Sequence, residues 1–132
     1  MTVSRRAALA GIGATLAAPF VLRERAQGAT GPGVTATEIK IGTTAPYSGP
    51  LSGLAVYGEA QTAFFRMIND NGGINGRKIN FLSLDNAFSP PKAVEQTRKL
   101  VEDDGVFAIA GFLGTPTNAA VQKYLNDKKV PS

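Results

Sequence analysis

The spacing of apolar and polar residues changes along the chain from the period of a β-strand to that of a helix. β-branched and other apolar residues predict strands over residues 39–44, 78–85 and 106–110. Helical spacing predicts helices over residues 57–71, 89–102 and 116–127. Strands and helices that alternate in this way predict right-handed βαβ crossovers and a parallel sheet, and therefore an α/β fold.

The apolar residues also predict which face each helix turns toward the sheet. In the first helix the apolar face carries Ala60, Phe64, Met67 and Ile68. The second helix is predicted to bury Val94, Thr97, Leu100 and Val101, and the third Ala120, Val121, Tyr124 and Leu125. The strand over residues 78–85 has apolar residues on both faces, which predicts helices on both sides of the sheet.

Residues 128–131 resemble the start of a fourth strand, and the sequence ends at Ser132. A parallel sheet of only three strands would leave an edge uncovered. We therefore expect residues 29–132 to be the N-terminal part of a longer protein, or the sequence to come from a truncated gene model. The alternative is a complete small flavodoxin-like domain, a fold that normally has five strands.

The first 28 residues are predicted to be an export signal. Arg5 and Arg6 form a basic start, residues 7–22 are apolar and small, and Ala26-Gln27-Gly28 fits a small-x-small cleavage site. The apolar stretch is too short and too rich in Ala and Gly to predict a membrane span. The paired arginines resemble the twin-arginine export motif, with an ordinary secretory signal as the alternative. We expect a periplasmic mature protein.

The charge balance argues against a nucleic-acid partner. Four of the 14 basic residues and one of the 10 acidic residues lie in the predicted signal, so the remainder has 10 basic and 9 acidic residues and a formal charge of +1. No basic patch is interleaved with aromatic residues. We therefore expect no nucleic-acid binding.

The residue types present give little support for catalysis. The sequence contains no cysteine and no histidine, which removes thiol nucleophiles, histidine bases and the usual zinc ligands. Asp85-Asn86 follows a predicted strand, but no second acid is near it in the pattern, so loop capping is favoured over a metal or catalytic role. We expect a protein that is not an enzyme and has no metal or other cofactor.

A turn over residues 112–118 carries the clearest binding signal. It joins the third predicted strand to the third predicted helix, where unpaired backbone N–H groups and the helix dipole favour a bound anion. Thr115, Thr117 and Asn118 add side-chain hydrogen-bonding groups. We expect this turn to hold a small anionic group. The alternative is that Thr115 only caps the helix, with Pro116 at the first helical position.

Three motifs, in this order and at this separation, resemble the type I periplasmic solute-binding proteins of ABC importers, in the branched-chain amino-acid-binding branch. The first is Ile39-Lys40-Ile41-Gly42 with the loop Ser48-Gly49-Pro50-Leu51-Ser52-Gly53 and Tyr57-Gly58. The second is the turn Asn69-Asp70-Asn71-Gly72-Gly73-Ile74-Asn75-Gly76-Arg77, followed by Lys78-Ile79 and later Asp85-Asn86 and Ala93-Val94. The third is residues 111–118, followed by Lys129-Val130-Pro131.

The resemblance implies a two-lobed protein that closes on a small molecule, with residues 29–132 as the N-terminal part of the first lobe. It implies that Leu113, Gly114 and Thr115 hold a ligand carboxylate, with Thr117 and Asn118 as neighbouring donors. Tyr57 matches a position that contacts the ligand from the wall of the cleft. Its alternative role is packing on the edge of the sheet. Pro116 departs from the family pattern and removes one N–H donor.

The function implied by the resemblance is that of an ABC importer's extracytoplasmic substrate-binding component. The solute would be a branched-chain amino acid or a similar small carboxylate or amide, and the protein partner a membrane permease. The alternative from another class is a ligand-sensing receptor ectodomain on the same fold.

Overall fold

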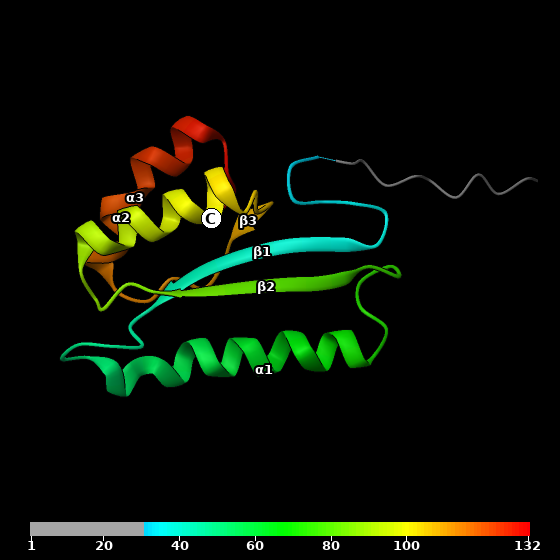
Figure 1. The fold of residues 1–132 in the computed structure, drawn as a ribbon, viewed down its shortest axis with the longest axis horizontal. Helices are drawn as coiled ribbons and strands as arrows, with labels where there is room; N and C mark the ends of the chain where they lie inside the picture. Colours follow the sequence, from blue (N-terminus) through cyan, green and yellow to red (C-terminus); the bar gives the residue numbers. More distant parts are fainter. Residues whose placement is uncertain (1–30) are drawn as a thin grey trace, which may run out of the picture.

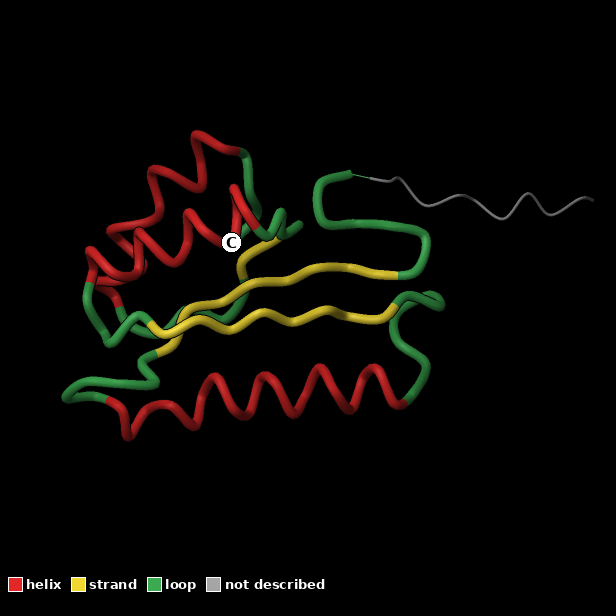
Figure 2. The backbone as a smooth tube through the Cα atoms, viewed as in Figure 1, coloured by secondary structure: helices red, strands yellow, loops and turns green. Residues whose placement is uncertain are grey.

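A computed structural model of the protein describes residues 31–132 (Figure 1). The predicted export signal over residues 1–28, including Arg5 and Arg6, lies outside the described residues. The described part has three layers: one helix, a parallel sheet, and two further helices on the opposite face of the sheet (Figure 2). The predicted α/β fold with a parallel sheet is therefore confirmed. None of the helices in residues 31–132 has the length and apolar character that a membrane crossing requires.

The sheet has the strand order β2-β1-β3. Strand β1 (Glu38–Ala45) pairs in parallel with β2 (Lys78–Asp85) along its whole length. Strand β3 (Ala108–Ile109) is shorter than predicted, but the N–H of Phe107 donates to Lys40 and that of Ala110 to Gly42, each at 2.9 Å, which extends the pairing on both sides. Because all three strands are parallel, the loops after them lie at one edge of the sheet.

The helices follow the predicted order. A 3-10 turn, η1 (Ser52–Ala55), leads into α1 (Val56–Asp70). Helix α2 (Pro90–Arg98) continues into a wider π-helical turn, η2 (Lys99–Asp103), and α3 (Thr115–Lys128) closes the described chain. After α3, the carbonyl oxygen of Pro131 accepts a 2.9 Å hydrogen bond from Ile109, so Pro131 lies beside β3. Residues 128–131 were predicted to start a fourth strand, but Lys128 still belongs to α3 and the residues after it form no strand in the described structure.

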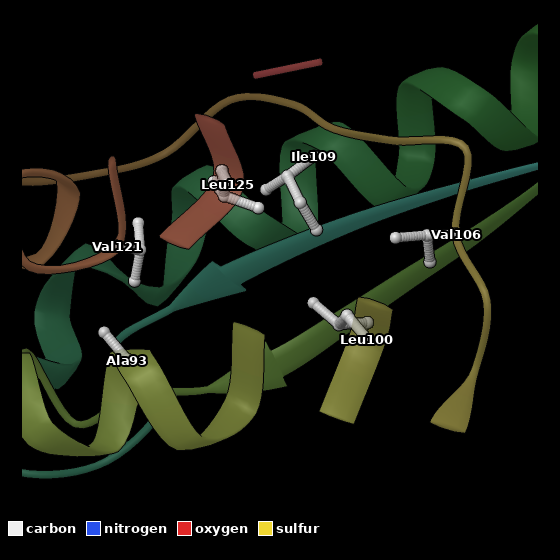
Figure 3. Close-up of a cluster of buried hydrophobic side chains, with 6 residues drawn as sticks. All are labelled: Ala93, Leu100, Val106, Ile109, Val121 and Leu125. Carbon is white, nitrogen blue, oxygen red and sulfur yellow. The ribbon is translucent and has the colours of Figure 1, made fainter. Parts of the chain in front are cut away.

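The core lies between the sheet and the α2–α3 layer. Figure 3 shows its six buried apolar side chains: Ala93, Leu100, Val106, Ile109, Val121 and Leu125. The predicted burial of Leu100, Val121 and Leu125 is confirmed. The prediction for Ala120 is wrong, because the positions of α3 that face the core recur every four residues from Thr117, and Ala120 lies outside that row and is exposed.

The apolar face predicted for α1 is wrong at Ala60, Phe64 and Met67, which are exposed, whereas the fourth predicted residue, Ile68, is half-buried. The side chains of Phe64 and Met67 are 52% and 51% exposed in the described structure. The neighbouring Phe65 faces the sheet instead, where its ring packs on that of Phe81 with 4.6 Å between centroids. The side-chain amide of Asn69 then fixes the end of α1, because it pairs with both the N–H and the C=O of Ile79 at 2.7 and 2.8 Å.

Candidate ligand-binding site at the carboxyl edge of the sheet

Three loops meet at the carboxyl edge of the sheet, one after each strand. Asn86, directly after β2, donates its N–H to the carbonyl of Ala45 at the end of β1, at 3.0 Å. The loop after β2 also contacts the turn after β3, where Phe88 lies against Gly114. In open parallel α/β sheets, ligands bind outside this edge. The predicted site residues of the third turn therefore lie where the fold itself favours binding.

The turn before α3 presents backbone donors. Gly114 occupies the N-cap position with φ of 96°, and no side chain caps the first turn. Thr115 is the first residue of the helix, so the alternative in which Thr115 is the cap is wrong. The first N–H groups of a helix have no partner inside it, and Pro116 has none to offer. Thr115 and Thr117 thus supply the first-turn N–H donors at the positive end of the helix dipole.

The side chains of this turn have three different environments. Thr117 is 1% exposed, and its hydroxyl donates to the carbonyl oxygens of Leu113 and Gly114, both at 2.8 Å. It therefore braces the turn and has no free hydroxyl proton for a ligand. Thr115 is exposed. The Oδ1 atom of Asn118 is buried and has no hydrogen-bond partner within residues 31–132.

Thr115 and Asn118 line one hollow of about 400 Å³ along α3, together with Gln122. Phe112 and Ser132 also line it. The hollow therefore combines an exposed hydroxyl, two side-chain amides and an aromatic surface. Such a mixed lining suits a small molecule with both a polar head and an apolar part.

Tyr57 lies in a different hollow. It is 54% exposed in the first turn of α1, beside Phe64 and Gly111 in a largely apolar hollow of about 440 Å³. Gln61 also lines this hollow, and its Nε2 donates to the carbonyl of Gly111 at 3.0 Å. The structure thus brings Leu113, Gly114, Thr115, Thr117 and Asn118 together and places Tyr57 on the α1 side of β3.

Asp85 fixes the loop after β1. Its Oδ1 accepts hydrogen bonds from the N–H groups of Tyr47, Ser48 and Ala87 at 3.0, 3.1 and 2.9 Å, and its Oδ2 pairs with Lys92 at 2.8 Å. The prediction that this residue caps a loop is confirmed. Burial raises the pKa of the Asp85 carboxyl, but the hydrogen bonds from Lys92 and Ser48 outweigh it and hold that pKa well below its ordinary value.

Two further residues at this edge of the sheet, Asn86 and Phe88, were not predicted to belong to a site. Asn86 is fully buried and donates from Nδ2 to the Thr44 hydroxyl at 3.0 Å. Phe88 packs against Gly114. An apolar residue in a loop carries no local motif, so only the tertiary contact identifies it. Within residues 31–132, no cluster of three or more Asp or Glu side chains is placed to hold a metal ion.

Comparisons with known proteins agree with this architecture. A family model described as periplasmic binding protein matches residues 38–132. The leucine-, isoleucine-, valine-, threonine- and alanine-binding protein of Pseudomonas aeruginosa is 33% identical over 95 residues, which cover 69% of this chain and 25% of that protein.

Two solved structures share the fold. A fatty acid ABC transporter substrate-binding protein from Thermomonospora curvata superposes with a TM-score of 0.69 and 31% identity, over 77% of this chain and 26% of that one. The branched-chain amino acid transporter substrate binding protein LivJ from Streptococcus pneumoniae, in complex with isoleucine, gives 0.68 and 28%, over 72% of this chain and 28% of that one.

The chain thus spans about a quarter of the length of the proteins that it matches. The sequence resemblance to type I periplasmic solute-binding proteins is confirmed. With a family match that runs from β1 to the last residue and a fold shared with solved structures, the chain belongs to the periplasmic binding protein family.

Proposed function

We propose that the protein is the substrate-binding component of an ABC importer and that it binds a small carboxylate-bearing solute in the periplasm. The observation that carries this proposal is the uncapped first turn of α3, placed at the carboxyl edge of the sheet in a chain of this family. Its partner would be a membrane permease. The described residues would contribute one wall of the site, and closure of a second lobe would favour the bound state through the contacts that form only then.

In this proposal the carboxylate of the solute lies at the turn over residues 113–115. The N–H groups of Thr115 and Thr117 and the Thr115 hydroxyl donate to its oxygens. Thr117 holds the turn from the inside through its bonds to Leu113 and Gly114. Asn118 lines the same hollow and adds a side-chain amide to its polar part.

Differently named relatives support a carboxylate as the feature that the solute carries. One is named for five amino acids, and another for a fatty acid. These ligands differ in size and in their amino group but share a carboxylate. A branched-chain amino acid is the first candidate, since LivJ contains isoleucine in its complex. A solute bound at the turn would need to extend past Gly111 to reach Tyr57.

Isothermal calorimetry on the full-length protein tests the proposal. The panel contains isoleucine, a medium-chain fatty acid and an aromatic carboxylate, each paired with its amide. We expect one carboxylate to bind and its amide to bind at least about tenfold more weakly, because a charged hydrogen bond is worth roughly 1.5–3 kcal/mol. Equal affinity for acid and amide, or no binding by any carboxylate, would contradict carboxylate recognition.

A further inference from the structure

The loop after β2 contains two consecutive residues in a backbone conformation that side chains disfavour. Ala87 has φ of 48° and Phe88 has φ of 57°, both in the left-handed region. Residues with a Cβ atom rarely adopt this region, and such residues persist only where the surrounding structure holds them. The surrounding structure must therefore hold Ala87 and Phe88 in this conformation.

Two side chains hold the pair in place. The N–H of Ala87 donates to Oδ1 of Asp85 at 2.9 Å, and the N–H of Phe88 donates to Oδ1 of Asn86 at 2.8 Å. Asn86 is itself fixed to β1, because its Nδ2 donates to the Thr44 hydroxyl and both side chains are fully buried. The position of Phe88 is therefore tied to the centre of the sheet.

The conformation brings the ring of Phe88 against Gly114. A methyl group added to Gly114 would lie 2.5 Å from Cε2 and 2.7 Å from Cζ of that ring, closer than any real contact. The ring thus occupies the space beside Cα of Gly114. The Thr117 hydroxyl bonds to the carbonyl of Gly114 at 2.8 Å, and its oxygen would lie 3.2 Å from the same added methyl group. Gly114 is therefore in contact with both an aromatic ring and a buried hydroxyl.

We propose that Phe88 is a positioning residue for the carboxylate-binding turn. Its ring fixes Gly114 at a φ of 96°, and this fixes the directions of the N–H groups of Thr115 and Thr117 before a solute arrives. Donors that are already oriented bind more tightly, because less conformational entropy is lost on binding. The effect of Phe88 on affinity rests on the proposed function, whereas its effect on the conformation of the turn can be measured without a ligand.

Two glycine substitutions in the full-length protein separate the ring from the backbone. Phe88→Gly and Ala87→Gly each place glycine at a left-handed position, so both relieve the same backbone cost, but only Phe88→Gly removes the ring. Phe88→Tyr keeps a ring and serves as the conservative variant. The first readout is the ¹⁵N order parameter of Gly114 and Thr115 in the ligand-free protein. We expect about 0.85 in the wild type, Ala87→Gly and Phe88→Tyr, and below about 0.6 in Phe88→Gly.

The second readout is calorimetry with the tightest carboxylate of the panel above and with its amide. Phe88→Gly should weaken the carboxylate about tenfold and reduce the preference for acid over amide, whereas Ala87→Gly and Phe88→Tyr should bind like the wild type. A general loosening of the fold would weaken both ligands alike and leave that preference unchanged. If no carboxylate binds the wild type, the proposed function fails, and the order parameters alone then test whether Phe88 positions the turn. An unchanged order parameter at Gly114 in Phe88→Gly would overturn the positioning role.

Discussion

The Asp85 carboxylate at the end of β2 accepts a 2.5 Å hydrogen bond from the hydroxyl of Ser48 in the loop after β1. The same carboxylate receives the N–H of Ser48 on its other oxygen. One side chain therefore accepts from both hydrogen-bond donors of a residue in another loop, and it links the end of β2 to the loop after β1. Asp85 therefore holds the loop after β1 in position, although the two are far apart in the sequence.

Asp85→Asn should destabilise the protein by about 1–3 kcal/mol, because the amide offers one acceptor oxygen where the carboxylate offers two and loses the charge that pairs with Lys92. The folded-state pKa of Asp85 lies below its unfolded value, so its stabilisation is complete above about pH 4 and is lost as the pH falls further. Urea unfolding between pH 7 and pH 2.5 measures both effects. The wild type should lose more stability on acidification than Asp85→Asn; parallel pH profiles would argue against the ionised network.

Thr115→Ala should weaken binding of a carboxylate solute to the full-length protein by about 1–3 kcal/mol, since a charged hydrogen bond would be lost. Thr37→Ala is the matched control, because Thr37 is also exposed but lies before β1, at the opposite edge of the sheet. Calorimetry should show a weaker affinity only for the first variant. If the two variants bind alike, Thr115 does not contact the solute.

Phe65→Ala should cost roughly 3 kcal/mol of unfolding free energy, because the Phe65 ring packs on Phe81. Phe64→Ala, one position away on the same helix, should cost much less, since that side chain is 52% exposed. Chemical denaturation of the two variants side by side measures the difference. An equal or larger loss for Phe64→Ala would mean that α1 turns its other face to the sheet.

Lys129→Gly should stabilise the protein by about 0.5–1 kcal/mol. Lys129 follows α3 with φ of 57°, a left-handed position at the end of a helix where glycine is preferred. Lys128→Gly, one residue earlier and still helical, should instead cost about 1 kcal/mol. Thermal unfolding of both variants gives the comparison, and a loss of stability in Lys129→Gly would contradict the left-handed cap.

Features that depend on neighbouring residues were predicted correctly, and features that depend on contacts between distant residues were not. The bounds of β2 were predicted correctly because alternating residues and the flanking glycine and asparagine turns fix them locally. The face of α1 that packs on the sheet was predicted wrongly. Phe64 and Phe65 are equally apolar, and only the contact with the distant Phe81 determines that Phe65 faces the sheet. In the same way, the turn over residues 113–118 is a candidate site that can be predicted from the local order of residues, whereas the contact between Phe88 and Gly114 depends on how two crossovers stack.

The most direct test of the account is a crystal structure of the full-length protein with its carboxylate solute bound. The account predicts a carboxylate oxygen about 2.7–3.2 Å from the backbone nitrogen of Thr115 or Thr117, at the first turn of α3. A solute whose carboxylate is bound elsewhere, with no oxygen in hydrogen-bonding range of residues 113–118, would contradict it.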